Sequence, residues 1–332
     1  MTRRSTAPME PPLRVLVAGV GAMGMRHVRA LGRVTTPCEV VACVDPDPRA
    51  RASVAVPAKS FEHVAQALDV VRPDAAIVAT STDAHVEVTE SLLAAGIPTL
   101  VEKPAAEDSA RALGLVLASR RTGTPVMVGH VERFNPAVSA ARGILDAGML
   151  GRLVAVSTRR LGRTPANVRR AGDVLVDLAI HDLDLVAWLS GATLDVVSAI
   201  GAGAPLVSTK ALLRAGPVAV DVHVGWNAPE AERVLTLEGD RAVATVDLLR
   251  RTCVVRSRPG TRRGSRVAVE VPVAGTDSLE RELDTFLRAV RAGAESMPVP
   301  LGEALRALAT AEAVRNVVVR EEVLPDERSR LP

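Results

Sequence analysis

Three side chains in this sequence have the types and surroundings needed to move a proton at a hydroxyl group. Lys103 lies in Glu102-Lys103-Pro104, after an apolar run, where a strand would end at a pocket, and it is one of three lysines among 41 Lys and Arg residues. Unlike a guanidinium, a lysine can share its proton. Asp177 and His181 are four residues apart, so a helix would place them on one face. His181 could then accept the hydroxyl proton, with Asp177 orienting it and Lys103 stabilising the developing alkoxide.

The segment around Asp177 and His181 also has a simpler interpretation. Apolar residues fill the other positions of the predicted helix: Leu175, Leu178, Ile180, Leu183 and Val186. A buried helix with a hydrogen-bonded core histidine fits this pattern equally. No metal is expected, because Asp177 and His181 have no clear third ligand.

A glycine pattern near the start of the chain predicts a dinucleotide site that could accept hydride. Gly19-Val20-Gly21-Ala22-Met23-Gly24 matches G-x-G-x-x-G between a strand-like run and a helical pattern. The first glycine would make the turn, the second would admit a pyrophosphate at the helix N-terminus, and the third would let helix and strand pack. Asp45 ends the next strand, about 20 residues later, where an acid holds the ribose hydroxyls and repels a 2′-phosphate. The pattern therefore favours NAD over NADP, although Asp45 could also serve as a turn residue before Pro46.

The elements that would position these residues change character along the chain. The first part alternates between strands (13–18, 40–44, 75–79, 99–101, 126–128) and helices (23–31, 61–68, 85–95, 105–120). Such alternation predicts a Rossmann-type, doubly wound parallel sheet. The second part has helices at 135–147, 174–189, 278–292 and 302–320, with strands at 153–159, 195–200, 210–213, 218–226, 233–238, 242–247, 252–256 and 266–271. Successive strands predict an α+β domain with a mostly antiparallel sheet.

We therefore expect an α/β protein with a flexible tail at 1–12, an NAD-binding Rossmann domain at 13–126, a substrate-binding and oligomerisation α+β domain at 127–322, and a tail at 323–332. Composition excludes some alternatives. The chain has no tyrosine and only 2% aromatic residues, which excludes a Tyr general acid and argues against stacking on single-stranded nucleic acid.

Cysteine usage and the start of the chain bear on the compartment. Three cysteines form no metal spacing and leave one unpaired, which favours a reducing cytoplasm. Residues 1–12 lack an apolar core, so no signal peptide is expected. No run is long enough to span a membrane, and no membrane partner is expected.

The motifs in this order resemble the glucose-fructose oxidoreductase / inositol dehydrogenase (Gfo/Idh/MocA) family, from about residue 13 to about residue 320. The resemblance implies that Lys103, Asp177 and His181 are the catalytic set, that the Lys-Pro bond is often cis, and that Lys103 faces the nicotinamide. In this family either the lysine or the histidine can be the base, and our assignment to His181 is a preference. The resemblance also implies a cofactor-binding set: Gly19, Gly21, Ala22, Met23, Gly24, Asp45, Thr80, Ser81, Thr82, His85, Glu102 and Lys103. For His85, an ordinary role at a helix start is an alternative.

Two segments resemble the branch that acts on nucleotide sugars, notably UDP-N-acetylglucosamine 3-dehydrogenases. They are residues 128–136 (VGHVERFNP) and 159–167 (RRLGRTPAN), the second where that branch has an arginine-bearing substrate loop. Arginine forks suit a diphosphate, although a solvated basic loop fits too. The resulting substrate-binding set is Lys103, Arg133, Asn135, Arg160, Arg163 and His181.

We expect an NAD-dependent dehydrogenase that oxidises a secondary hydroxyl, foremost the 3-hydroxyl of a UDP-amino sugar such as UDP-N-acetylglucosamine. The missing tyrosines depart from such substrate domains, so an inositol or sugar phosphate, as in aminoglycoside or other secondary metabolism, stays open. So do an NADPH-dependent keto-sugar reductase and a non-catalytic dinucleotide-sensing regulator. A homodimer or homotetramer is expected by resemblance. The arginine run at 250–266 is expected to be a solvated hairpin, with no nucleic-acid partner.

Overall fold

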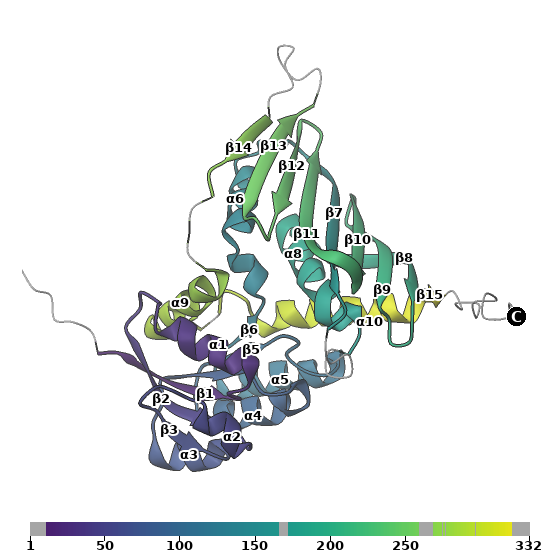
Figure 1. Cartoon of the computed structure of the whole chain (residues 1–332). Helices are drawn as coiled ribbons and strands as arrows, with labels where there is room; N and C mark the ends of the chain where they lie inside the picture. Colours follow the sequence, from purple (N-terminus) through teal and green to yellow (C-terminus); the bar gives the residue numbers. More distant parts are fainter. Residues whose placement is uncertain are drawn as a thin grey trace, which may run out of the picture. The chain divides into compact units, whose positions relative to one another are not determined.

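The computed structural model describes residues 11–165, 172–258, 268–273, 275, 277–295 and 297–320, which form two compact units (Figure 1). The first unit contains the described residues up to Phe134 together with 277–305, and the second contains Asn135 to Gly275 and the residues from Arg306 onward. The sequence predicted one boundary after residue 126. The structure instead places residues 127–134 and 277–305 with the first unit, because strand β6 (Val126–Gly129) pairs with β5 (Thr99–Glu102) and helix α9 (Ser278–Arg291) fills the first core.

The first unit is built on a six-stranded parallel sheet with the order β3-β2-β1-β4-β5-β6. This is the strand order of dinucleotide-binding folds, and it confirms the predicted fold class. The strands are β1 (Leu13–Ala18), β2 (Cys38–Val44), β3 (Lys59–Phe61), β4 (Ala75–Val78), β5 and β6. The helices are α1 (Ala22–Leu31), α2 (Pro48–Ala52), α3 (Val64–Val70), α4 (Thr82–Ala94), α5 (Ser109–Thr122), α9 and the short 3₁₀ turn η1 (Val131–Phe134).

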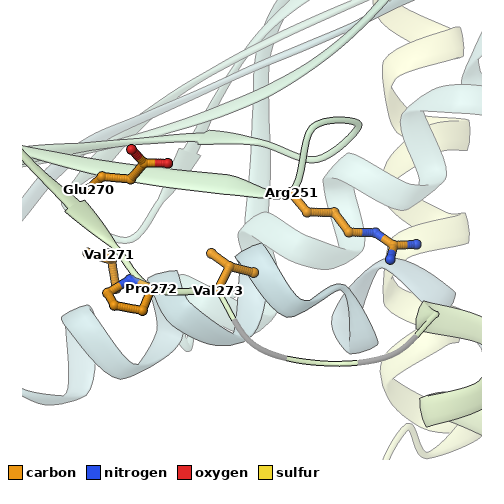
Figure 2. Close-up of a pocket in the computed structure, with 5 residues that line it drawn as sticks. All are labelled: Arg251, Glu270, Val271, Pro272 and Val273. Carbon is orange, nitrogen blue, oxygen red and sulfur yellow. The ribbon is translucent and has the colours of Figure 1, made fainter.

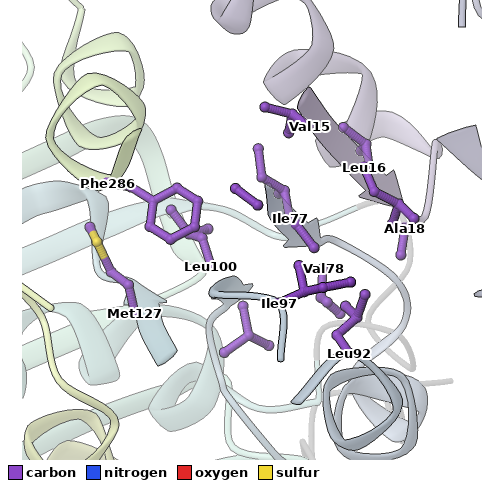
Figure 3. Close-up of a cluster of buried hydrophobic side chains, with 14 of the residues drawn as sticks. Val15, Leu16, Ala18, Ile77, Val78, Leu92, Ile97, Leu100, Met127 and Phe286 are labelled. Atoms are coloured by element: carbon purple, nitrogen blue, oxygen red, sulfur yellow. The ribbon is translucent and has the colours of Figure 1, made fainter. Parts of the chain in front are cut away.

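The core of this unit depends on residues far apart in the sequence. The central strands are buried on both faces, and most of their side chains are accordingly apolar. Figure 3 shows Phe286 of α9 beside Leu100 and Met127 of the sheet. Asp284 of α9 also accepts backbone hydrogen bonds from Thr35 and Thr36, at 3.0 and 2.8 Å. Helix α9 therefore completes a core that the first 134 residues begin.

The second unit is built on a nine-stranded sheet with the order β14-β13-β12-β11-β7-β10-β9-β8-β15. Most pairs are antiparallel, as predicted, and β7–β10 and β8–β15 are parallel. The strands are β7 (Leu153–Arg163), β8 (Leu194–Ala202), β9 (Ser208–Ala215), β10 (Val218–Gly225), β11 (Asn227–Gly239), β12 (Ala242–Asp247), β13 (Thr252–Ser257), β14 (Ala268–Val271) and β15 (Val318–Arg320). One face packs on α6 (Pro136–Asp146), the π-helical segment η2 (Leu175–Ala179), α8 (Ile180–Ser190) and part of α10 (Leu301–Val317).

Three predicted helices begin or end elsewhere for local reasons. Residue Phe61 ends a strand, and α3 begins only after the His63 cap. Helix α5 begins at Ser109 rather than residue 105, because the Asp108 side chain caps it by accepting from the N–H of Arg111. The final helix ends at Val317, because the β-branched residues after it pair with β8.

Candidate active site

The glycine fingerprint forms a tight loop between β1 and α1. Gly19 has a φ of 82°, a conformation that favours glycine, and any side chain there would meet the Ala79–Thr80 backbone. A Cβ on Gly24 would overlap the carbonyl oxygen of Gly19. By contrast, Gly21 has open space around its Cβ position and caps α1 without a side-chain hydrogen bond. The loop therefore leaves the α1 N-terminus accessible, which suits a pyrophosphate.

Asp45 lies at the end of β2, beside this loop. Its Oδ2 accepts a hydrogen bond of 2.9 Å from the N–H of Val20, and its Oδ1 accepts one of 2.9 Å from the N–H of Asp47. The carboxylate is thus held against the fingerprint, and its oxygens have further acceptor capacity for ribose hydroxyls. One Arg51 nitrogen donates to the carbonyl oxygens of Asp45 and Pro46.

The predicted cofactor residues that follow β4 lie at the carboxyl edge of the same sheet. Ser81 is the cap residue of α4, with Thr80 before it and Thr82 as its first residue. His85 is buried, and its ring nitrogens lie 2.8 Å from the carbonyl oxygen of Pro104 and 3.3 Å from that of Thr80. The histidine therefore links the end of β4 to the segment after β5. Such a structural contact fits the alternative that His85 has an ordinary role at a helix start.

We predict an acid-dependent loss of stability from His85. Burial lowers the pKa of His85 below its usual 6.5, so acid protonates the unfolded chain first. This contribution is therefore present above about pH 6.5 and is lost as pH falls. In thermal unfolding between pH 7.5 and 5, His85→Gln should lose less stability than the parent. His63→Gln, at an exposed histidine, is the matched control, and an equal acid loss in both variants would contradict the prediction.

Lys103 directly follows β5 and precedes a cis Pro104, as the resemblance implied. Oε2 of Glu102 accepts a 3.1 Å hydrogen bond from the Lys103 backbone N–H, and Oε1 lies 2.7 Å from Nε2 of His27. Burial opposes ionisation of Glu102, but the hydrogen bond and charge of His27 and the charge of Lys103 lower its pKa overall. A side chain on Gly129 would press on this carboxyl.

His27 is a residue that the sequence analysis missed. It is fully buried on α1 and links the fingerprint helix to the residue beside Lys103. The signal was available: one of only six histidines lies three residues after Gly24, on the face of the helix that packs inward.

Asp177 and His181 lie in the second unit, where the structure departs from a regular helix. Residues 175–179 form a π-helical turn, and α8 begins at Ile180. Such turns are frequent at functional sites. Both side chains are partly exposed, while Leu175 and Ile180 of the same segment are buried. Oδ2 of Asp177 accepts a 3.0 Å hydrogen bond from the indole N–H of Trp226, a buried residue that the sequence analysis did not identify.

The structure keeps Lys103 in one unit and Asp177 with His181 in the other, so the joint catalytic set stays a prediction. Within the second unit, Asp182 follows His181 directly and is held by Arg160, whose Nε and Nη2 lie 3.0 and 2.9 Å from Oδ1. Both side chains of this pair are buried. Arg160 therefore helps fix the helix that carries His181.

The predicted substrate loop at 159–167 is a strand over its first five residues. Residues 159–163 belong to β7, because that strand pairs with β10 and β11 on its two sides. Arg163 is exposed and donates to the carbonyl oxygen of Pro229 at 3.0 Å. Ala166 and Asn167 lie outside the described residues.

Two other predicted substrate residues have structural contacts. Arg133 is buried and forms a 2.6 Å ion pair with Glu303. Asn135 caps α6 by accepting from Ala137, and its amide donates to the carbonyl oxygen of Leu248. Their roles in substrate binding stay predictions.

Other surfaces lie apart from these residues. A hollow of about 370 Å³ is lined by Arg251, Glu270, Val271, Pro272 and Val273, none of which is a predicted site residue. Figure 2 shows these five side chains. In the arginine run, Arg250 pairs with Asp247 and Arg258 with Glu238, while Arg262, Arg263 and Arg266 lie outside the described residues. Among the residues that the structure describes, no three His, Cys, Asp or Glu residues are grouped for a metal ion. Within all the residues that the structure describes, no helix is long and apolar enough to cross a membrane.

The strand order, the open helix N-terminus and Asp45 define a dinucleotide-binding α/β protein. Residues 13–130 match the NAD-binding Rossmann domain of an oxidoreductase family, and residues 138–245 match the C-terminal domain of the same family. The chain belongs to the GFO/IDH/MocA oxidoreductase family. The prediction of an oxidoreductase fold that binds NAD is therefore confirmed at the level of the family.

Individual relatives differ in their substrates. A myo-inositol dehydrogenase, Hyg17, from Streptomyces leeuwenhoekii is 37% identical over 56% of this chain and 57% of its own length. An inositol 2-dehydrogenase from Streptomyces avermitilis is 32% identical over 87% of this chain and 88% of its own. The structure of UDP-N-acetylglucosamine 3-dehydrogenase GnnA from Acidithiobacillus ferrooxidans has a TM-score of 0.82 at 25% identity, over 93% of this chain and 98% of that one. The chain spans about half the length of several curated relatives that it matches.

Proposed function

We propose that this chain is an NAD-dependent dehydrogenase that oxidises a secondary hydroxyl of a cyclic polyol or sugar. The observation that carries the proposal is the carboxyl edge of the first sheet. There the open N-terminus of α1 lies beside the fixed carboxylate of Asp45, and Lys103 follows β5 of the same sheet, with β4 between β5 and β1. Ligands of open α/β sheets bind at this edge.

In the proposed reaction, the chain's own residues handle the proton. Lys103 would hydrogen-bond the substrate hydroxyl and stabilise the alkoxide. His181 would take the proton, with Asp177 orienting it and Trp226 holding Asp177 by the indole hydrogen bond. Bound NAD would accept hydride from the carbon that bears this hydroxyl.

A cyclitol of the inositol class is the substrate that we now favour. The relatives at 37% and 32% identity are named inositol dehydrogenases. Two arginines of the predicted substrate-binding set, Arg133 and Arg160, are buried and form ion pairs with Glu303 and Asp182. These contacts weaken the case for a nucleotide sugar.

A UDP-amino sugar oxidised at its 3-hydroxyl is the second candidate. It is supported by the similarity to UDP-N-acetylglucosamine 3-dehydrogenase over 98% of that chain, and by the segment 128–136. The exposed Arg163 is the arginine of the predicted set best placed to meet a phosphate.

A spectrophotometric screen tests these proposals. NADH formation would be followed with inositol isomers, UDP-sugars and sugar phosphates, with NAD and NADP in parallel. We expect turnover with NAD and an inositol. Turnover only in reverse, with NADPH and a keto-sugar, would favour the reductase. Tight NAD binding without turnover in either direction would favour the dinucleotide sensor.

We predict that Asp45→Ala weakens NAD binding roughly tenfold or more, the magnitude of a lost hydrogen bond to a charged group. The preference for NAD over NADP should also narrow, because the repulsion of a 2′-phosphate is lost while Arg51 remains beside the site. Titration of both dinucleotides by fluorescence measures this. Asp47→Ala, at an exposed neighbouring acid, is the control, and unchanged NAD affinity in Asp45→Ala would show that Asp45 only supports the turn.

We also propose a homo-oligomer that covers the outer face of the second sheet. Exposed apolar side chains occur there on β7, β8, β9 and β15: Val154, Val197, Ile200, Leu212 and Val319. A second copy of the chain would bury this face. Light scattering of Ile200→Glu should then show a smaller species than the parent.

The three cysteines are free thiols, and we keep the cytoplasm as the proposed compartment.

A further inference from the structure

Glu282 is a buried acid that the proposed reaction does not use. It lies on α9 in the first unit, on the inward face of the helix with Leu279, Leu283 and Phe286. Its exposed fraction is 0%, and among the described residues neither carboxyl oxygen has a hydrogen-bond partner. A buried polar group of this kind is costly and calls for an explanation.

Glu102 is the charged residue that acts on the pKa of Glu282. Burial raises the pKa of Glu282 well above its usual value, and the negative charge of Glu102 raises it further. The pKa of Glu102 is lowered, because burial is outweighed by His27 and Lys103. Glu282 is fully buried without a partner, which favours its neutral form, whereas the contact with His27 favours the charged form of Glu102.

This division matters because of what Glu102 holds. One of its oxygens pairs with His27 of α1, and the other accepts from the backbone N–H of Lys103. Nδ1 of His27 also has no hydrogen-bond partner among the described residues. A second carboxylate beside Glu102 would repel it and disturb the residue that carries the proposed catalytic ammonium.

We propose that Glu282 is a positioning residue: as a neutral buried acid on the helix that packs against α1, it leaves Glu102 the sole carboxylate of the cluster formed by His27, Glu102 and the Lys103 backbone, and so keeps that backbone fixed. The effect on catalysis rests on the role proposed for Lys103. Helix α9 packs against α1 and η1, whose titratable and charged groups are Arg26, His27, Arg29, Glu132 and Arg133. His130 directly precedes η1, and Glu102 and Lys103 join the cluster through His27. Arg133 is paired with Glu303, and Glu102 is the charge that acts on Glu282.

The sign of the pH dependence follows from the raised pKa. The folded chain holds a proton on Glu282 that the unfolded chain releases above about pH 4.3. The stability contributed by this group is therefore fully present below that pH, and it is lost as pH rises through the folded pKa. Glu282→Gln, a neutral side chain of the same shape, removes this loss. The unfolding temperature of the variant should rise relative to the parent as pH increases.

The experiment compares the parent, Glu282→Gln and Glu280→Gln between pH 5 and 9. Glu280 lies on the same helix and pairs with Arg33, so its variant is the matched control. Three measurements are made: unfolding temperature, NADH binding by fluorescence, and kcat with whichever substrate is turned over. The parent's infrared spectrum at neutral pH should also contain the carbonyl band of a protonated acid, which Glu282→Gln lacks.

We expect parental kcat and NADH affinity for Glu282→Gln at neutral pH, and an upper pH limb displaced to higher pH. A displacement of about one pH unit corresponds to a roughly tenfold difference in rate above the limb. A pH-independent stability difference, or no protonated-acid band, would show that Glu282 is ionised and overturn the proposal. A band and stability shift with unchanged kcat and NADH profiles would overturn the positioning role. If no substrate is turned over, the pH profile of NADH affinity still tests the positioning role of Glu282. Failure of the dehydrogenase proposal can therefore be distinguished from failure of this one.

Discussion

Replacing Lys103 with arginine is expected to reduce kcat by at least about 10²-fold, the low end for a lost acid–base contribution. The substitution keeps the positive charge near Glu102 but replaces a compact ammonium with a larger, planar guanidinium that does not release its proton. The backbone at residue 103 is held by Glu102, so the wider head group cannot retreat by moving the chain. Steady-state kinetics with the substrate found in the screen would measure the effect.

The chain supplies a matched control for this change. Lys59→Arg makes the same substitution at an exposed lysine of β3 in the same unit and should leave kcat at the parental value. NADH affinity should be retained in both variants. If Lys103→Arg works as fast as the parent, positive charge alone is required at this position, and the proton-sharing role is wrong.

Gly24→Ala is expected to have the largest effect on the first unit. The new Cβ would overlap the carbonyl oxygen of Gly19, which is backbone and cannot rotate away. Relief requires α1 to move away from β1, at a cost of about 3 kcal/mol or more, the upper range for overpacking. The same movement displaces the fingerprint loop, so NAD binding should be lost together with stability. Chemical denaturation and NADH fluorescence would measure both.

Gly114→Ala is the control for Gly24→Ala. Gly114 lies within α5, and its Cβ position has no atom within 4 Å. Alanine there should stabilise the helix by about 0.5–1 kcal/mol and leave NAD binding unchanged. A Gly24→Ala variant that unfolds at the parental denaturant concentration would show that the loop tolerates a side chain at this position.

Much of the fold could be predicted from sequence because local patterns coincide with the elements. The buried parts of the central parallel strands are apolar runs, as in β4, and the antiparallel strands alternate, as in β9, where every second residue is buried. Caps were harder to predict. Asp108 and His63 delay α5 and α3, and apolar periodicity alone does not reveal a cap. The placement of α9 in the first core could not be predicted, because no local pattern records which sheet an amphipathic helix covers.

The candidate site shows the same division between local and long-range information. The fingerprint, Asp45 and Lys103 follow strand ends, so topology alone predicts their common edge. The partners are different: His27 reaches Glu102, and Trp226 reaches Asp177, across 75 and 49 residues. Strand alternation places Arg160 against Asp182 in the interior, and its predicted contact with substrate stays a prediction. Spacing identified the candidate residues, whereas the residues that support them depend on tertiary contacts.

The return of the chain to the first unit has a consequence for biosynthesis. Helix α9, which carries Phe286, is translated more than a hundred residues after β6. At about 5–20 residues per second, it emerges on the order of ten seconds later. Until then the nascent nucleotide-binding half exposes the apolar surface that α9 will cover. The first unit cannot complete its core before the second unit and α9 have been synthesised. Truncation after residue 134 should therefore yield an aggregation-prone fragment rather than an autonomous cofactor-binding domain.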